Sequence, residues 1–305
     1  MQIAFLGLGL IGGSVARAAT VAGFATRIRA WTPGGTGPRA AAADGIEACT
    51  SAAAAIDGAD LVVLAAPPLA CLDLLDELGG PLRADLAPDA VIPDVASTKA
   101  VLVDRARNLG LRFVGGHPMA GRESSGYAAL DADLFRDRPW VVVPAEPVDP
   151  EADARVAALA VACGGRPFLM TAGEHDLAVA AISHVPLVVA AALVEAMAGA
   201  GDWANAAALA AGGWASMTRL AGGDPAMAAG IVATNGPAIA SRLRGVRAVL
   251  DSWLELIEDT PGAAQDGQGP REAPDRARAR TAELRFADAR RLNGARERGD
   301  AGRWD

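Results

Sequence analysis

The chain has 305 residues, of which 51% are hydrophobic, and it carries a formal net charge of −8 at pH 7. This length exceeds that of a typical single domain, so two packed units with apolar cores are expected. The acidic balance argues against a nucleic-acid partner, and the three cysteines contain no Cys-x-x-Cys pair of the kind that binds zinc or performs redox chemistry.

The first half of the sequence alternates strand-like and helix-like segments. Strands are predicted at Gln2–Leu6, Arg27–Trp31, Leu61–Ala65, Ala90–Val95, Arg112–Gly115, Trp140–Pro144 and Pro167–Thr171. The segments between most of them, beginning with Ile11–Ala22, suit packed helices. This alternation indicates an α/β Rossmann-type fold with a doubly wound, mostly parallel sheet, which we place at residues 1–171 as a dinucleotide-binding domain.

The second half changes character at about Gly173. Runs of β-branched residues stop, and long Ala- and Leu-rich stretches with glycine breaks continue to Ile257, which predicts an all-α domain at residues 172–260. Residues 261–275 are rich in Gly, Pro, Gln and Asp and are predicted to form a flexible linker. Residues 276–305 are charged and are expected to form an exposed or partner-packed C-terminal helix or tail.

Two apolar stretches resemble export or membrane signals. The N-terminal one lacks a preceding positive residue and is interrupted by glycines. The other, Ala178–Gly201, contains His184, Pro186 and Glu195, which do not suit a membrane span. We therefore expect a cytoplasmic protein without a membrane partner, in which the second stretch is a buried helix.

A glycine fingerprint follows the first strand and opens the first helix, in the run Gly7-Leu8-Gly9-Leu10-Ile11-Gly12. Gly7 permits the tight turn, Gly9 lets the backbone approach a pyrophosphate, and Gly12 allows the helix to pack closely on the strand. The helix N-terminus favours the phosphate charge. The motif in this context predicts a bound NAD or NADP.

The residue that selects between these cofactors is expected at the end of the second strand. An Asp or Glu there would bind the ribose hydroxyl of NAD, but this strand ends at Thr32 and the next acid is Asp44. Thr32 with Arg29 or Arg39 would instead suit the 2′-phosphate of NADP. The alternative is that both arginines are solvated surface charges.

Two further strand ends carry candidate residues. Ala66 and Pro67 end a strand expected near the nicotinamide, where Pro rigidifies the chain. Ser97 and Lys99 end the next, and their spacing suggests a hydrolase dyad, although no nucleophile elbow or oxyanion pocket can be located. A simpler interpretation is that Ser97 caps the following helix.

The loop at Gly116–Gly126 places His117 and small residues at the edge of the sheet where open α/β folds bind ligands. His175 and His184 lie in the helical half. A buried histidine needs a partner, so His184 is either a satisfied core residue or a ligand contact.

Together these motifs resemble the prephenate and arogenate dehydrogenase family. The resemblance covers about residues 1–258 and rests on the glycine fingerprint, Asp94-x-x-Ser97-x-Lys99, His117-Pro118-Met119-Ala120-Gly121, Glu174-His175-Asp176, Ser183-His184-x-Pro186, Gly212-Gly213-Trp214 and Met217-Thr218-Arg219. It implies a soluble enzyme of tyrosine biosynthesis that oxidises and decarboxylates a cyclohexadiene with NAD or NADP, NAD being favoured by the family, and without a metal.

The resemblance also implies roles for individual residues. His117 would accept a hydrogen bond from the substrate hydroxyl and help to remove its proton. Ser97 would bind the same hydroxyl or orient His117. Arg219 would anchor a carboxylate, since a guanidinium meets a carboxylate with two parallel hydrogen bonds.

The pocket for the substrate side chain would be lined by His184, Glu123 and the backbone at Gly213. Many family members carry a histidine where this chain has Leu187, so both prephenate, with a keto group, and arogenate, with an ammonium group, are candidate substrates. Family members dimerise through the helical half, so a homodimer is expected.

Two other interpretations are weighed against this one. A 3-hydroxyacid or imine-reducing dehydrogenase also pairs a Rossmann unit with a helical domain, but the His-Pro-Met-Ala-Gly loop argues against it. A dinucleotide sensor without chemistry would keep the glycines and would need none of His117, Ser97 or Arg219.

Overall fold

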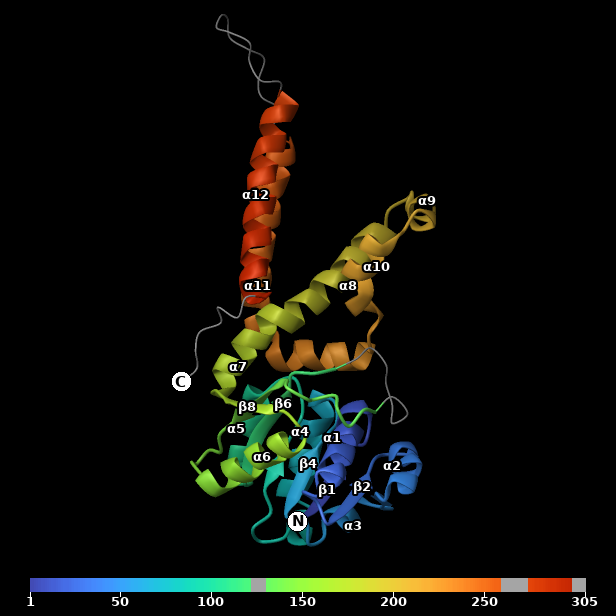
Figure 1. Cartoon of the computed structure of the whole chain (residues 1–305), viewed down its shortest axis with the longest axis vertical. Coiled ribbons are helices and arrows are strands. Elements are labelled where there is room, and N and C mark those ends of the chain that lie inside the picture. The colour runs from blue at the N-terminus through green and yellow to red at the C-terminus, as the bar shows by residue number, and fades with distance from the viewer. Residues whose placement is uncertain (122–129, 259–273, 298–305) are drawn as a thin grey trace, which may run out of the picture. The chain divides into compact units, whose positions relative to one another are not determined.

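The structure, a computed structural model, describes residues 1–121, 130–258 and 274–297. The chain divides into two compact units, Met1–Arg242 and Leu243–Asp305 (Figure 1). The first unit contains the sheet and most of the helices. The second contains the last part of one long helix and a C-terminal helix.

The sheet has the predicted, mostly parallel character. Its strands are β1 (Gln2–Leu6), β2 (Arg27–Trp31), β3 (Glu47–Ala48), β4 (Leu61–Leu64), β5 (Ile92–Pro93), β6 (Phe113–Pro118), β7 (Pro139–Val143) and β8 (Arg166–Leu169). They form two four-stranded sheets, with the orders β3-β2-β1-β4 and β5-β6-β7-β8. Parallel bridges join the edges of the two sheets, because Leu61 and Leu64 of β4 pair with Val91 and Asp94. Only the β6–β7 pairing within these orders is antiparallel. The two-residue β3 was not predicted, because a strand so short leaves no periodic signal.

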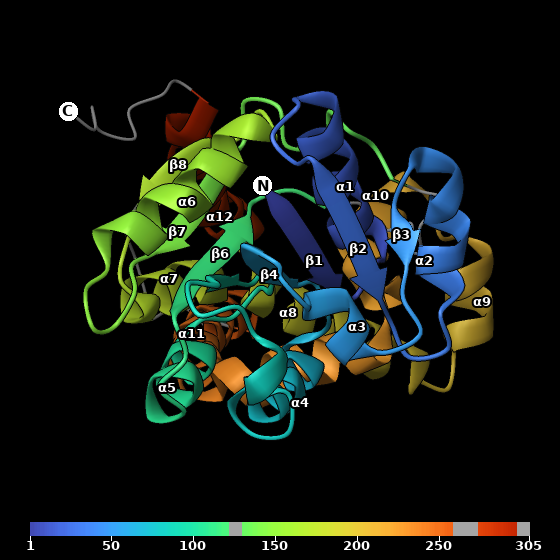
Figure 2. The same cartoon turned by 90° about the horizontal axis from the view of Figure 1, so that it is seen from below.

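Helices cover both faces of this sheet, as Figure 2 shows. They are α1 (Leu10–Val21) and α6 (Pro150–Ala162) on one face, and α3 (Ala52–Ile56), α4 (Pro68–Gly79) and α5 (Ala100–Asn108) on the other, with α2 (Thr36–Ala41) after β2. Alternate residues of β1 enter separate cores, Ile3 and Phe5 with α1, Ala4 and Leu6 with α3 and α4. A strand buried on both faces reads as a continuous apolar run, which is why these strands were predictable.

The helical half consists of α7 (Ala172–Val179), a π-helical turn (Ala180–His184), α8 (Val185–Ala198), α9 (Trp203–Ala208), α10 (Gly212–Thr218), a 3-10 turn (Arg219–Gly222) and α11 (Pro225–Glu258). Pro186 has no N–H to donate to the carbonyl of Ile182, which accounts for the wider π turn beside it. Asn235 interrupts α11 with a non-helical φ of −130°, two residues before Pro237. The two irregularities meet, because the Asn235 amide nitrogen lies 3.1 Å from Nδ1 of His184, the last residue of the π turn.

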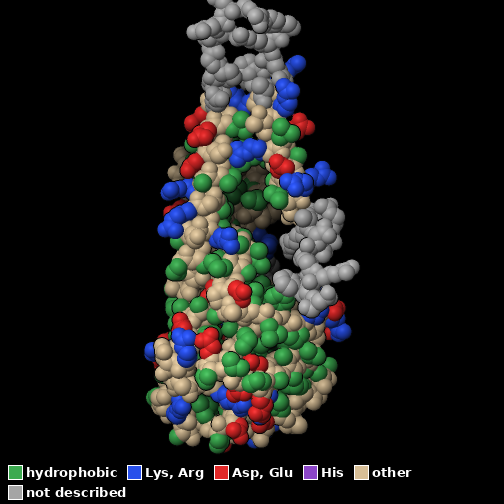
Figure 3. Space-filling model, turned by 90° about the vertical axis from the view of Figure 1, so that its left-hand side faces the viewer, with side chains coloured by type: hydrophobic (Ala, Val, Ile, Leu, Met, Phe, Trp, Pro, Cys, Tyr) green, Lys and Arg blue, Asp and Glu red, His purple; other side chains and the backbone are tan. Residues whose placement is uncertain are grey.

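The expectation of a buried apolar helix at Ala178–Gly201 is wrong for the single chain. Within the helix Ala172–Ala198, an apolar 18-residue window has a mean hydropathy of 2.3, and only 28% of that window is buried. By length and composition the helix passes the test for a membrane span, a test that helices of soluble proteins pass as well. Leu177, Ile182 and Met197 are among its exposed side chains, and Figure 3 shows one face on which many hydrophobic side chains are exposed.

The second unit pairs the last turns of α11 with α12 (Pro274–Glu297). The rings of Trp253 and Phe286 lie 5.0 Å apart, and the Arg285 guanidinium lies 4.0 Å from the Trp253 ring centroid. Arg285 also donates to the Ser252 carbonyl at 3.1 Å. Aromatic and cation–π contacts therefore hold the two helices together.

Candidate active site

The candidate site lies at the carboxyl edge of the neighbouring strands β1, β4, β5 and β6. Adjacent parallel strands end at the same edge, so the residues that follow them are brought together. Gly7 follows β1, Ala66 and Pro67 follow β4, Ser97 follows β5, and His117 lies near the end of β6. This is the predicted edge of the sheet.

The glycine turn has the geometry that the fingerprint requires. Gly7 has a φ of +101°, and a Cβ there would lie 2.3 Å from the Ala65 carbonyl oxygen. A Cβ on Gly12 would lie 2.7 Å from the Ala65 Cβ. Gly9 is the N-cap of α1 and faces open space, with no described atom within 4 Å of a Cβ. Gly7 and Gly12 thus serve the fold, while Gly9 leaves room for a phosphate group at the helix N-terminus.

These differences predict that two alanine substitutions affect different properties, one the stability of the fold and the other cofactor binding. Gly7→Ala forces a side chain into a left-handed backbone and against a carbonyl, so we expect a loss of at least about 1–3 kcal/mol in the free energy of unfolding. Gly9→Ala should leave that free energy unchanged but weaken NAD(P) binding by roughly tenfold or more, since about 1.4 kcal/mol suffices. Urea unfolding and cofactor titration of both variants measure the two effects. Equal loss of stability in both would contradict this division.

The end of β2 corrects one sequence interpretation. Arg29 is buried, and its guanidinium donates to the carbonyls of Ala54, at 2.9 Å, and Asp57 at the end of α3. It is therefore neither a solvated surface charge nor available to a cofactor phosphate. Thr32 and the exposed Arg39 remain at this strand end, and Arg39 donates to the Gly34 carbonyl at 2.7 Å.

A chain of hydrogen bonds connects His117 to the N-terminus of α5. His117 Nδ1 lies 2.8 Å from His175 Nε2, and His175 Nδ1 lies 2.8 Å from Asp176 Oδ1. The backbone N–H groups of Lys99 and Ala100 donate to Asp176 at 2.8 and 2.9 Å. His175 and Asp176 are buried, whereas His117 keeps partial exposure. Of the three side chains that these hydrogen bonds connect, only that of His117 therefore reaches the edge of the site.

A buried ion pair lies beside these histidines. Lys99 Nζ contacts the Asp94 carboxylate and donates to the Thr98 carbonyl at 3.0 Å, and both charged side chains are fully buried. Asp94 also accepts the backbone N–H groups of Ala96 and Gly116, each at 2.9 Å. The pair therefore fixes the backbone that precedes Ser97 to the backbone that precedes His117.

His184 is fully buried and is held by Asn235, at the interruption in α11. The Asn235 amide donates to the Asp176 backbone carbonyl at 2.8 Å and lies 3.1 Å from His184 Nδ1. Because that amide nitrogen is a donor, Nδ1 of His184 accepts, and a neutral His184 carries its proton on Nε2. Nε2 is buried without a well-formed hydrogen bond among the described residues, although the backbone of Ser97 lies close to the ring.

All three histidines favour the neutral form. Burial lowers the pKa of His117 well below 6.5, and the electrostatic effects of His175, Lys99 and His184, each of which opposes a second positive charge nearby, lower it further. Burial also lowers the pKa of His175, against the hydrogen bond to Asp176. Burial lowers the pKa of His184 to about 4. For Asp176, burial acts to raise the pKa, but the hydrogen bonds from His175, Ala100 and Lys99 outweigh it and the pKa is lowered.

These shifts predict that stability falls as the pH drops from about 6.5 toward 4. The unfolded chain protonates its histidines near pH 6.5, whereas the folded chain resists this, so the unfolded state binds more protons in that window. Above pH 6.5 the stabilisation is complete. Urea unfolding at about pH 7.5, 6 and 5 measures the effect. The His184→Leu variant should show a shallower pH dependence, and an unchanged dependence would contradict the contribution of His184.

Ser97 has neither of the two structural roles that were predicted for it, as a helix cap or as a residue that orients His117. Its Oγ is buried and makes no hydrogen bond within the described residues, so Ser97 neither caps α5 nor orients His117. Asp176 caps α5 instead, and His175 contacts His117. A buried hydroxyl without a partner is unfavourable, so its position at the edge of the site favours a role in binding a polar ligand group.

The remaining predicted residues lie in other elements. Gly213 is exposed near the start of α10, and Arg219 is exposed at the start of the 3-10 turn, which packs on α8. Neither belongs to the hydrogen-bonded chain around His117. Glu123 lies outside the described residues.

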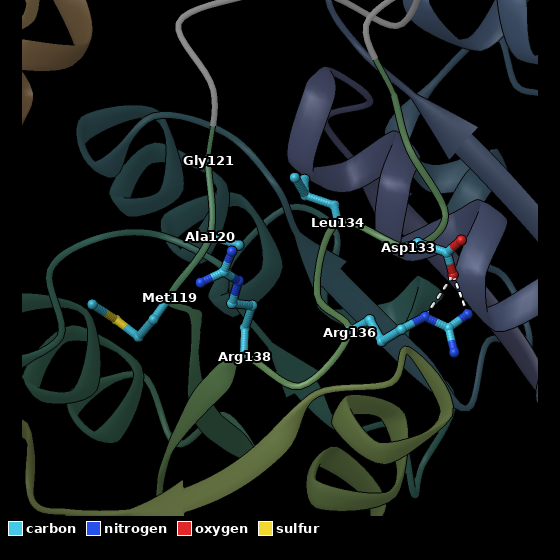
Figure 4. Close-up of a pocket in the computed structure, with 7 residues that line it drawn as sticks. All are labelled: Met119, Ala120, Gly121, Asp133, Leu134, Arg136 and Arg138. Carbon is cyan, nitrogen blue, oxygen red and sulfur yellow. Dashed lines mark hydrogen bonds and ion pairs between the residues drawn. The ribbon is translucent and has the colours of Figure 1, made fainter. Parts of the chain in front are cut away.

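A pocket of about 390 Å³ adjoins the segment that follows His117 (Figure 4). Its lining residues are Met119, Ala120, Gly121, Asp133, Leu134, Arg136 and Arg138. Arg136 pairs with Asp133, whereas the Arg138 side chain extends toward the segment that carries Ala120. The pocket therefore places Arg138, which has no carboxylate partner within the described residues, near the loop of His117.

Three polar residues of the network had no role assigned from sequence. Asp176 and His175 appeared only as part of a family motif, and Asn235 was not singled out. The one local signal for Asn235 is the sequence Asn235-Gly236-Pro237 inside a helical stretch, which breaks helices.

The two halves of the chain match two models of one protein family. Residues 15–169 match "Prephenate dehydrogenase, nucleotide-binding domain", and residues 171–266 match "Prephenate dehydrogenase, dimerization domain".

Individual proteins agree with this result. The prephenate dehydrogenase of Bacillus subtilis is 34% identical over 197 residues, which are 63% of this chain and 52% of that protein. This chain thus spans about half the length of that relative. The structure of A. aeolicus prephenate dehydrogenase in complex with hydroxyphenyl propionate and NAD+ has a TM-score of 0.81 at 25% identity, covering 96% of this chain and 98% of that one. The structure of Synechocystis arogenate dehydrogenase has a TM-score of 0.74 at 29% identity and covers 98% of this chain and 99% of that one.

Proposed function

Because this chain belongs to the prephenate dehydrogenase family, we propose that it converts prephenate to 4-hydroxyphenylpyruvate by NAD(P)-dependent oxidative decarboxylation. The observation that carries this proposal is the joint placement of a partly exposed histidine, His117, and an unpartnered buried hydroxyl, Ser97, at the sheet edge beside the glycine turn. Residues 1–171 would bind the cofactor, and residues 172–260 would complete the substrate site and form the dimer.

The cofactor would be held by the backbone of Gly7, Gly9 and Gly12, with Leu10 and Ile11 in the first turn of α1. The room at Gly9 and the free N-terminus of α1 fit a dinucleotide pyrophosphate. Thr32 would lie at the adenosine end, and Ala66 with Pro67 at the nicotinamide end. When bound, a nicotinamide supplies the acceptor for the hydride that the substrate releases.

The substrate hydroxyl would be bound between Ser97 and His117. Nε2 of His117 makes no hydrogen bond with the described residues, so it is free to accept the hydroxyl proton as the hydride leaves the same carbon. Loss of the ring carboxylate as carbon dioxide then aromatises the ring. His184, with its proton on Nε2, is suited to donate to a side-chain oxygen, and Arg219 and Glu123 would complete the substrate contacts with the Gly213 backbone.

Arogenate is the second candidate substrate. The Synechocystis arogenate dehydrogenase has the same fold over nearly the whole of this chain, and the two substrates differ only in the side-chain keto or ammonium group. A donor at His184 favours the keto group over the ammonium group, which has no acceptor. Prephenate is therefore the preferred proposal.

A two-by-two assay tests both specificities. Purified protein is incubated with prephenate or arogenate and with NAD or NADP, and reduced cofactor is followed by absorbance. Turnover of prephenate supports the proposal, and turnover of arogenate alone replaces it by the second candidate. If the protein binds a dinucleotide but reduces it with neither substrate, the proposal is wrong.

The Arg39→Ala variant separates the two interpretations of the β2 end. If Arg39 holds a 2′-phosphate, the substitution raises KM for NADP and leaves KM for NAD unchanged. If Arg39 is a surface charge, neither value changes.

We also propose that the protein is a soluble homodimer of the cytoplasm. The exposed apolar surface of Ala172–Ala198 and the match of residues 171–266 to a dimerization domain support an interface in the helical half. Light scattering after gel filtration gives the mass of the assembly, and a monomer at all concentrations would overturn this proposal.

A further inference from the structure

The three histidines of the chain all belong to one buried hydrogen-bond network. A neutral imidazole carries one proton, and which nitrogen carries it decides whether the other is an acceptor. The network contains groups whose donor or acceptor character is fixed. These groups determine the proton positions of the histidines.

Asp176 provides one fixed end. Its Oδ1 and Oδ2 each accept a backbone N–H at the N-terminus of α5, from Lys99 and Ala100. A carboxylate that accepts these bonds is stabilised as an anion, and an anionic carboxylate can only accept. His175 Nδ1, 2.8 Å from Oδ1, must therefore be the donor.

The proton on His175 Nδ1 determines the proton position on His117. A neutral His175 with its proton on Nδ1 has a free electron pair on Nε2. His117 Nδ1 lies 2.8 Å from that Nε2, so His117 must donate from Nδ1. The remaining nitrogen of His117, Nε2, then carries no proton and is an acceptor, which is the state that a general base requires.

The surroundings disfavour the opposite arrangement, in which His175 donates from Nε2 and His117 carries its proton on Nε2. It needs either a protonated Asp176, which the two backbone donors oppose, or a doubly protonated His175. A charged His175 would lie in a buried site near the positive charge of Lys99, with Asp94 engaged in its own ion pair with that lysine. His184, the other titratable group near these rings, also favours its neutral form and adds no compensating negative charge.

We propose that His175 and Asp176 are positioning residues that hold His117 with its proton on Nδ1 and an unprotonated Nε2 directed to the substrate site. When His117 accepts a proton at Nε2, the resulting cation keeps its donated hydrogen bond to His175, which Asp176 supports in turn. The kinetic part of this inference rests on the proposed function. The proton positions themselves do not.

Nitrogen NMR of the histidine side chains tests the inference directly. With three histidines in the chain, a protein labelled with ¹⁵N-histidine gives three imidazole spin systems, assigned by single substitutions. At about pH 7.5, where burial keeps all three rings neutral, we expect His117 and His175 to carry the proton on Nδ1 and His184 to carry it on Nε2. His184 thus serves as an internal reference of the opposite type. A proton on Nε2 of His117 in the native protein would overturn the inference.

The His175→Gln variant provides the second readout. It removes the fixed acceptor for His117 Nδ1, because a glutamine amide can present either its oxygen or its nitrogen. We expect His117 to populate both proton positions and kcat to fall in proportion to the fraction that keeps Nε2 unprotonated, roughly two- to tenfold for a mixed population, with KM and cofactor affinity little changed.

Thr234→Val is the matched control. Thr234 is also buried and precedes Asn235, but its hydrogen bonds, to Thr98 Oγ1 at 2.9 Å and to the Gly230 carbonyl at 2.7 Å, involve none of the histidines. It should lose stability without changing the His117 proton position or kcat. If Thr234→Val lowers kcat as much as His175→Gln does, the effect is structural and the inference fails. If the NMR result holds but no cyclohexadiene is turned over, the proposed function fails and the positioning inference stands.

Discussion

The His117→Asn variant should lose turnover by roughly 10²- to 10⁴-fold, the range that general acid–base catalysis contributes. An asparagine amide can still donate to His175 Nε2, so the hydrogen bond at 2.8 Å that holds this position can be kept. What is lost is the ring nitrogen that accepts the substrate proton. The loss should appear in kcat and not in KM, because the interaction strengthens only in the transition state.

Cofactor titration and thermal unfolding of the same variant provide the controls. Binding of NAD(P) should match that of the native protein, since the glycine turn lies on β1 and α1 and His117 on β6. A variant that retains more than a tenth of the native kcat would show that His117 is not the base.

The largest effect on stability is expected from Lys99→Met. The substitution leaves the carboxylate of Asp94 buried without its cation, and removing one partner of a buried ion pair destabilises a protein by about 3–5 kcal/mol. The backbone amides of Ala96 and Gly116 still donate to Asp94 and offset part of the loss. Urea unfolding at neutral pH measures the change.

The double variant Asp94→Asn with Lys99→Met identifies the cause. A neutral amide removes the uncompensated charge while its oxygen can still accept a backbone N–H. We expect the double variant to recover more than half of the free energy of unfolding that Lys99→Met alone loses. No recovery would indicate that the lysine stem, packed against Gly115, matters more than its charge.

The Rossmann architecture was predictable because it depends on local patterns. Strands buried on both faces are apolar along their whole length, and the glycine fingerprint combines a turn and a helix start within six residues. The predicted strand at Gln2–Leu6 has the same bounds in the structure, and the one at Arg112–Gly115 differs by a few residues. The polar residues at the strand ends could be placed at one edge by topology alone.

The partners of those residues could not be predicted in the same way. His117 and His175 are 58 positions apart, and Asn235 is 59 positions from Asp176. Their contacts depend on how the helical half packs on the sheet, which no periodicity encodes. The prediction that Ser97 caps a helix failed for this reason, since a residue distant in sequence, Asp176, performs the capping.

The buried ion pair has one further consequence, because Lys99 is the single lysine of the chain. A lysine-specific protease has one cleavage site, and the folded protein keeps that site fully buried between two strand ends. Cleavage at this bond requires the sheet edge to open, so the rate at which two fragments appear reports the frequency of that opening. The native sequence thus contains its own probe of opening, and binding of cofactor or substrate at the same edge should slow its cleavage.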